Sequence, residues 1–160
     1  MPAAKGAEVI LDDLAVTGEL SRLELQLGRG THIKLGASAT LTIDRFIAGV
    51  RTDVELRKGP AFVDRPPDAE PNFSMSSPYA LIAVRGTSFF AGPSNGVFGV
   101  PSNRVFGVFV QQGQVYVRTR WPTIRLTAGE GTDIAFPGAC PTAPARWPDP
   151  RVAAAIASVS

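Results

Sequence analysis

Apolar and polar residues alternate along most of the chain, and this pattern predicts short β-strands. Leu23, Leu25 and Leu27 share one face of a segment whose other face carries polar side chains. Side chains on a strand point alternately to its two faces, so the pattern indicates strands that are buried on one side. The same alternation marks residues 31–35, 50–57 and 79–90. Turn residues recur about every eight to twelve positions, a spacing typical of a sandwich, barrel or solenoid.

Two glycine-containing segments are predicted to be turns between neighbouring strands. Gln111-Gln112-Gly113 has the length and composition of a hairpin loop, and Ala128-Gly129-Glu130-Gly131 is a further turn signal. The strands that they join are expected over residues 105–110, 114–119, 124–127 and 132–136.

A segment rich in Pro, Asp and Ser, residues 64–77, interrupts the alternation. Such residues favour turns, so the segment is predicted to be a surface loop. Phe73 and Met75 are its apolar residues, and we expect them to reach into the core.

Helical periodicity occurs only at the C-terminus, where a helix is predicted over residues 150–159. Asp149 is a fitting N-cap and Pro150 a fitting first helical residue. Val152, Ile156 and Val159 form one apolar stripe, with Trp147 and Ile156 as the expected contacts. A helix this short is marginal alone and must pack on the β-body.

The predicted fold is therefore all-β, with short antiparallel strands in two stacked sheets, either a β-sandwich or a twisted, solenoid-like arrangement, and one short C-terminal helix. The division expected is a β-domain over residues 1–139 and a C-terminal extension over residues 140–160. Composition agrees, because 16 Gly and 14 Pro among 160 residues exclude a helical bundle, and 44% apolar residues exclude a disordered chain. No apolar run is long enough to span a membrane.

Charge gives little support to nucleic-acid binding, because 16 basic and 14 acidic residues leave a net charge of only +2. The densest basic stretch contains Arg118, Arg120 and Arg125, interleaved with Tyr116 and Trp121. Two interpretations remain open: the arginines are the outward positions of strands, or they flank aromatic rings that stack on a ligand such as a sugar.

The residues needed for catalysis or metal binding are scarce, so neither an enzyme nor a cofactor is predicted. Cys140 is the only cysteine, which is either buried or paired with another chain, and His32 is the only histidine and is expected on a solvated strand face. Asp53 and Glu55 share a strand face about 7 Å apart, a separation also seen between glycosidase carboxylates. Solvated strands commonly carry such pairs, and no glycine-rich phosphate loop is present.

An octapeptide is duplicated in tandem: residues 93–100 match residues 101–108 at seven of eight positions. The second copy is expected to run into the strand over residues 105–110, and the first to extend or protrude from a hairpin tip. The duplication is either a tolerated insertion or a contact loop, in which exposed Val97 and Phe98 would favour self-association.

Five segments resemble, in the right order, the motifs of FecR-type domains: residues 25–38, 54–62, 83–89, 110–117 and 126–131. The most specific is Val84-Arg85-Gly86-Thr87-Ser88-Phe89, which is similar to the family's "V-R-G-T-x-F" signature. The resemblance covers residues 23–136. It implies an extracytoplasmic, β-rich domain of the kind found in anti-sigma regulators, which relay a signal from an outer-membrane siderophore transporter.

The signature residues Val84, Arg85, Gly86, Thr87 and Phe89 are expected to be structural. Glycine permits a bulge at Gly86, and Thr87 is suited to bond a backbone group that the bulge frees. Arg85 is expected to pair with a carboxylate such as Asp53 or Glu55.

No sigma-binding helical domain or membrane helix accompanies the motifs in this sequence, so the resemblance implies a stand-alone module. The first six residues lack the apolar region of a signal peptide. The protein is then either cytosolic or begins after a removed leader, and the resemblance favours a periplasmic or extracellular location.

The predicted function is a non-enzymatic, periplasmic or secreted module for protein interaction or signal sensing, which binds a protein partner or itself. The alternative is a carbohydrate-binding or structural β-protein of the cell envelope. The candidate interaction surface consists of Val97, Phe98, Tyr116, Arg118, Arg120 and Trp121.

Overall fold

The computed structural model describes residues 14–16, 23–27, 31–47, 51–65, 72–95 and 104–159. Their strands are β1 (Leu14–Val16), β2 (Leu23–Leu27), β3 (Thr31–Leu35), β4 (Thr40–Ile47), β5 (Arg51–Lys58), β6 (Ala61–Asp64), β7 (Asn72–Ser76), β8 (Leu81–Asn95), β9 (Arg104–Arg118), β10 (Ile124–Thr127), β11 (Glu130–Ile134) and β12 (Ala145–Arg146). One helix follows, α1 (Asp149–Val159). The predicted fold class is confirmed, and no helix of the described residues is long and apolar enough to cross a membrane.

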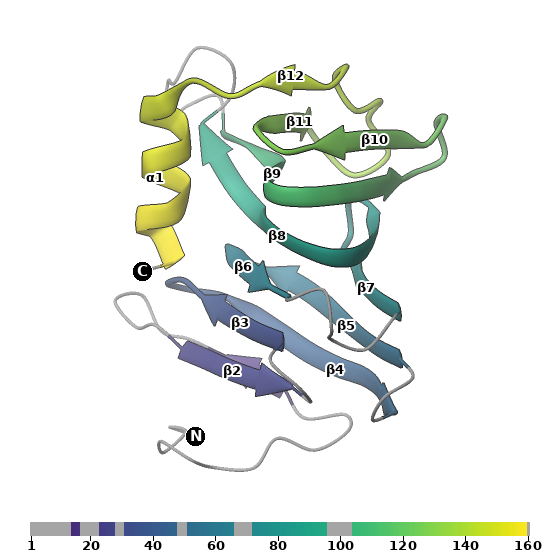
Figure 1. The fold of residues 1–160 in the computed structure, drawn as a ribbon, viewed down its shortest axis with the longest axis vertical. Helices are drawn as coiled ribbons and strands as arrows, with labels where there is room; N and C mark the ends of the chain where they lie inside the picture. The colour runs from purple at the N-terminus through teal and green to yellow at the C-terminus, as the bar shows by residue number, and fades with distance from the viewer. Residues whose placement is uncertain are drawn as a thin grey trace.

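The strands form one continuous hydrogen-bonded sheet that curls around a core (Figure 1). Its main path runs β1-β4-β5-β7-β8-β6-β3-β2, and β9 joins β8 to the group β10, β11 and β12. Every pair is antiparallel except β5 and β7, which run parallel. Two layers thus arise from a single mixed sheet, because β8 pairs with β7 along its first half and with β6 along its second.

The main core lies inside this curl and draws on both layers. Its fully buried members include Ile33 and Leu35 of β3, Val54 and Leu56 of β5, and Ile82 of β8. The members from β3 and β5 are the apolar positions of the alternating pattern, so the burial side predicted from the sequence is correct in these two strands.

The segment predicted as a loop over residues 64–77 contains strand β7. Phe73 and Met75 are buried, as expected, but they belong to a strand that pairs with β5 and β8. Ser74 and Ser76 occupy the outward positions of β7. The error arose because a strand with serine on its exposed face resembles a loop in composition.

The predicted hairpin at Gln111-Gln112-Gly113 is wrong, because β9 continues through it as one strand of 15 residues. Residues on both sides of this segment pair with β8, for example Val117 with Ile82 and Val108 with Ala91. Gly113 has a φ of 91°, a conformation that suits a β-bulge as well as a hairpin turn. The strand therefore bends here and does not reverse.

Irregularities in β8, in β9 and between β10 and β11 lie side by side across the sheet, near Gly113. We call this row of irregularities the bend line. In β8, the pairing shifts between Arg85 and Ser88, so that Gly86 and Thr87 form the bulge expected from the signature. In β9, the register shifts again opposite Ser88 and Phe89. Bulges increase local bending, so aligned irregularities fold the whole ribbon over the core.

The predicted turn at residues 128–131 is the third irregularity, and it also does not reverse the chain. β10 and β11 run in the same direction along β9, pairing with its residues 114–117 and 106–109. The Gly129 amide donates to the Val110 carbonyl at 2.8 Å across the break. β10 and β11 are thus two halves of one edge that bends with β8 and β9.

Thr87 ties the bend line together from a fully buried position. Its hydroxyl donates to the Gln114 carbonyl of β9 at 2.8 Å. Its own carbonyl accepts from the Arg65 amide, 3.1 Å away, just after β6. The bond expected for Thr87 is confirmed, and it links β8 to the strands on either side.

Helix α1 packs on the opposite face of the upper half of β8 and β9 (Figure 1). A second cluster forms there from Phe90, Phe109, Trp147, Ala155 and Val159. Gly131 lies under the Trp147 ring, where an added Cβ would come within 2.1 Å of the indole nitrogen. The absence of a side chain at residue 131 therefore makes room for Trp147.

Two details of the predicted helix are wrong. Pro148 supplies the first helical carbonyl, accepting from the Val152 amide at 3.1 Å, so the helix begins one residue earlier and Asp149 lies within its first turn. Val159 of the predicted stripe is buried and Val152 packs beside it, but Ile156 is only half-buried and Ala155, which the stripe did not include, is buried. Ala155 was missed because a small residue contributes little to apolar periodicity.

A charged pair fixes the helix to the sheet. The Arg151 guanidinium makes two hydrogen bonds to the Asp133 carboxylate, one of them 3.2 Å from Nη1 to Oδ2. Both side chains are about 10% exposed, and the Arg151 Cζ lies 3.6 Å from the centre of the Trp147 ring. Arg151 of the helix thus contacts both the Asp133 carboxylate of β11 and the Trp147 ring.

Replacing Thr87 with valine tests the bend line, since valine keeps the shape and removes the hydroxyl. The Gln114 carbonyl would lose its donor, so we expect a loss of about 1–3 kcal/mol in the free energy of unfolding measured in urea. Thr123→Val, at an exposed threonine, is the control and should change little. Equal stability of both variants would contradict the assigned bond.

Removing the Asp133 carboxylate should leave the Arg151 charge enclosed without its partner. We expect Asp133→Ala to lower the free energy of unfolding by about 3–5 kcal/mol. The exposed Asp149, in the first turn of the same helix, gives a matched variant, Asp149→Ala, whose loss should stay below about 1 kcal/mol. Similar losses for the two variants would show that the Arg151 contact does not hold the helix.

Glu130 should make stability depend on acid pH. Its Oε1 accepts from the Thr127 hydroxyl at 2.7 Å and from the Thr127 amide at 2.9 Å. These bonds, with smaller help from Arg125 and Arg146, lower the pKa of the Glu130 carboxyl below its ordinary value of 4.5. The stabilisation is complete above the ordinary pKa and is lost as pH falls through the lowered one.

The measurement is a carbon-detected NMR titration of the Glu130 carboxyl, with acid unfolding of Glu130→Gln alongside. The variant should lose the part of the acid dependence that Glu130 contributes. Titration of Glu130 at or above its ordinary pKa would refute the bond.

Candidate functional site

The outer surface of five neighbouring strands, β5, β7, β8, β9 and β10, presents two rows of directly paired residues, which we call the outer face. The pairings follow from the strand register. One row is Glu55, Ser76, Leu81 and Arg118, and the other is Asp53, Ser74, Ala83, Tyr116 and Arg125.

The intervening residues explain why these side chains point outward. Val54, Met75, Ile82, Val117 and Leu126 alternate with them along the same strands and are almost completely buried. Because successive side chains of a strand face opposite ways, burying this apolar set commits the other set to solvent.

The outer face is polarised, with carboxylates at the β5 end and arginines at the β9 and β10 end. Asp53 Oδ1 accepts from the Ser74 hydroxyl at 2.5 Å, and Glu55 pairs with Arg57 at 2.7 Å. Arg118 and Arg125 are exposed, and neither forms an ion pair with another residue that the structure describes. Arg118 therefore offers a positive charge with no ion-pair partner among the described residues, and Arg125 has only the longer-range attraction of the Glu130 carboxylate.

Large apolar side chains lie beside these arginines. Leu81 is 37% exposed, Tyr116 41% and Trp121 42%. The small side chains of Ala83 and Ser74 separate them from the acidic end. Exposed aromatic residues next to arginines are the composition enriched in protein interfaces.

Trp121 and Arg120 follow β9, in the connection to β10. The indole nitrogen of Trp121 donates to the Gly138 carbonyl at 3.1 Å, and the Arg120 Cζ lies 5.5 Å from the ring centre. The ring is therefore held in place beside the outer face while part of it remains open to solvent.

The structure thus brings together four members of the candidate interaction surface. Tyr116 and Arg118 lie on the outer face, where the outward interpretation of Arg118 and Arg125 is confirmed, and Arg120 and Trp121 lie next to them. Val97 and Phe98 lie outside the described residues. Sequence reasoning missed Leu81 and the two serines, because only strand register reveals which residues are neighbours.

The signature residues lie mainly in the core and the bend line. Val84 and Phe89 are buried in the main core and Thr87 lies in the bend, while the Arg85 side chain is outside the described part of the structure. Asp53 and Glu55, its expected partners, have the contacts with Ser74 and Arg57 given above.

The remaining candidates for chemistry lie apart from one another. His32 is on the solvated side of β3, 3.7 Å from Glu24, and Cys140 is exposed with a free thiol. Within the described ranges, no three His, Cys, Asp or Glu side chains gather as metal ligands.

The copies of the duplicated octapeptide meet in the β8–β9 hairpin. Pro93 pairs with Phe106 and Ser94 with Val105, so the start of the first copy lies against the end of the second. The expectation that the second copy enters a strand is confirmed, and residues 96–103 lie outside the described residues.

Comparison with solved structures finds the same fold. Two crystal structures of "a putative anti-sigma factor" from Parabacteroides distasonis ATCC 8503, at 1.65 and 2.50 Å resolution, align with TM-scores of 0.72 and 0.73. Sequence identity is 19% and 18%, over 90% and 91% of this chain. The chain spans only 64% and 65% of the length of those proteins. No curated protein matches the sequence.

The family model described as "FecR protein" matches residues 13–116. These residues include β1 to β8 and most of β9, with the bulge that contains the signature. This chain therefore belongs to the FecR family.

Proposed function

We propose that this protein is a non-enzymatic signal-sensing or regulatory module that works in the periplasm or outside the cell, by binding a protein partner through the outer face. Membership of the FecR family supports a regulatory role, and the structural neighbours named as anti-sigma factors agree with it. The location is inferred from the family alone.

The single observation that carries the binding surface is the arginine end of the outer face. Arg118 and Arg125 present positive charge beside Tyr116 and Leu81, on a sheet whose opposite side is packed into the core. A sheet fixes the backbone positions of these side chains, so binding orders the side chains alone and the entropy cost of association is reduced. Arginine charge also steers an acidic partner toward the face.

A gene-expression experiment tests the proposal. Cells that lack the gene should show altered transcription of a defined gene set, and the wild-type chain should restore it. The variant Arg118→Glu/Arg125→Glu should fail to restore it, because reversed charge repels an acidic partner. Both substitutions are at exposed positions, so the variant should fold.

The matched control is Lys34→Glu, a charge reversal at an exposed position of β3, which should restore transcription. Two outcomes would contradict the proposal. Deletion without any transcriptional effect would remove the regulatory role, and full restoration by the double variant would remove the outer face as its surface.

Carbohydrate binding is the second candidate, favoured by the exposure of Trp121 beside Tyr116. An open aromatic ring is the usual platform for a sugar. However, Arg120 already lies over the Trp121 ring, and its indole N–H is already donated to Gly138. A protein partner fits this arrangement better, because it needs no vacant ring face.

A further inference from the structure

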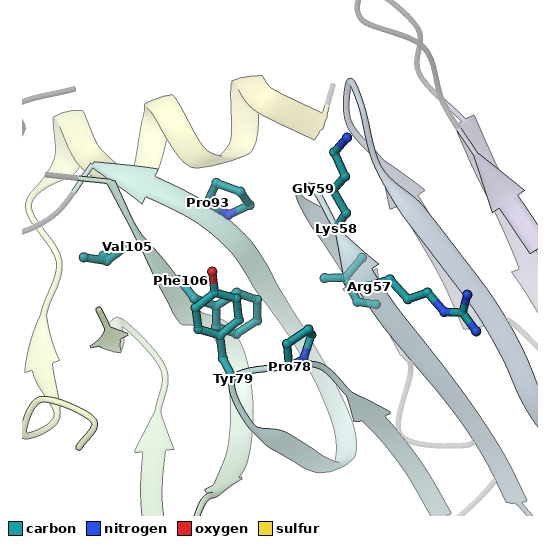
Figure 2. Close-up of a pocket in the computed structure, with 9 residues that line it drawn as sticks. Arg57, Lys58, Gly59, Pro78, Tyr79, Pro93, Val105 and Phe106 are labelled. Atoms are coloured by element: carbon teal, nitrogen blue, oxygen red, sulfur yellow. The ribbon is translucent and has the colours of Figure 1, made fainter. Parts of the chain in front are cut away.

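A pocket lies near the N-terminal end of β9, whereas Arg118 lies at its C-terminal end. The pocket is formed between the β5–β6 turn, the last residues of β8 and the first residues of β9 (Figure 2). Its volume is about 230 Å³. We call it the Tyr79 pocket, and its lining consists of Leu56, Arg57, Lys58, Gly59, Pro78, Tyr79, Pro93, Val105 and Phe106.

One wall of the pocket is a pair of stacked rings. Tyr79 and Phe106 are nearly parallel, with ring centres 4.6 Å apart and an angle of 5° between planes. Figure 2 shows Pro93 and Val105 beside these rings and Lys58 on the facing side. The pocket is thus apolar in its wall and cationic at its rim.

The wall is held in position before any ligand arrives. The Ser77 hydroxyl accepts from the amides of Tyr79 and Ala80, at 3.2 and 3.0 Å, and the Ser77 amide donates to the Ala80 carbonyl at 2.9 Å. These bonds fix the short connection that carries Tyr79. A preformed wall lowers the cost of binding.

Two polar groups at the pocket remain available to a ligand. Arg57 is paired with Glu55, and in Figure 2 its guanidinium points away from the rings. Lys58 is exposed and forms no ion pair with a residue that the structure describes. Nor does the Tyr79 hydroxyl bond to any of the described residues.

We propose that the Tyr79 pocket binds one apolar side chain from an acidic segment of a protein partner. The volume is below the roughly 300–1,000 Å³ of pockets for drug-sized ligands and suits a single phenylalanine or leucine side chain. The Lys58 ammonium complements a neighbouring carboxylate, and the Tyr79 hydroxyl donates to a peptide carbonyl or carboxylate. One buried anchor with a charged rim is the usual form of a strong interface contact.

The test uses short capped peptides and the full chain, followed by amide chemical shifts in NMR. The peptides are Gly-Asp-Phe-Asp-Gly, the same sequence with Lys replacing Asp, and the same sequence with Ser replacing Phe. We expect the first to shift the amides of Tyr79 and Val105, with a dissociation constant of about 1 mM or tighter. The Lys peptide should bind about tenfold more weakly, and the Ser peptide should not bind detectably.

Variants of the pocket sharpen this expectation. Lys58→Glu should reverse the preference between the Asp and Lys peptides, whereas Lys34→Glu, an equal charge change on β3, should leave it as in the wild type. Tyr79→Phe keeps the ring and should weaken the Asp peptide about fivefold. Thermal unfolding of each variant confirms that the chain is folded.

Three results with the peptides and the pocket variants would overturn the proposal, and a fourth comes from the duplicated segment. The three are the absence of shifts at the pocket with every peptide, equal binding of the Asp and Lys peptides, and binding that no pocket variant changes. A tighter Asp-peptide complex with Phe98→Ser than with the wild type would assign the pocket to this chain's own duplicated segment, and would also overturn it. The pocket variants leave Arg118 and Arg125 of the outer face unchanged, so a failure here is distinguishable from a failure of the regulatory test.

Discussion

The bulge at Gly86-Thr87 is the constraint on which the rest of the fold depends. It bends β8 so that one strand pairs with β7 before the bulge and with β6 after it. The hydroxyl of Thr87 bonds β9, and its carbonyl accepts from the residue that follows β6. Matching irregularities in β9 and between β10 and β11 let the whole ribbon follow. In this chain, the signature residues Gly86 and Thr87 therefore form the bend.

The bend also separates the two surfaces to which we assign binding. Below it, β8 and β9 continue the sheet of β5 and β7, so that Tyr116 and Arg118 lie in line with Asp53 and Glu55 on the outer face. Above it, the same two strands are buried on both sides, by the main core and by the cluster around Trp147. Their far ends then meet the β5–β6 turn, where the Tyr79 pocket forms.

Much of the fold could be predicted from residue patterns, and the failures share a physical cause. Alternation correctly gave β3 and the buried side of β5, because burial on one face leaves a period of two. Gly113 was predicted to lie in a hairpin turn because a positive φ occurs in bulges and in hairpin turns alike. The β7 segment was predicted to be a loop because its outward serines give it the composition of a loop. The outer face could be predicted only in part: Tyr116 and Arg118 are close in sequence, but their neighbours Leu81 and Ser76 come from other strands, and register is a tertiary property.

The central claim is that β8, β9 and the β10–β11 edge bend together without reversing, and cross-strand NMR contacts test it most directly. We predict amide and α-proton contacts that pair Ile82 with Val117 and Ala91 with Val108 within one continuous β9, and contacts of Gly129 with Val110. A hairpin at Gln111–Gly113 would instead bring Val108 beside residues 115–117 and leave Gly129 without its partner in β9. The second set of contacts would contradict the account.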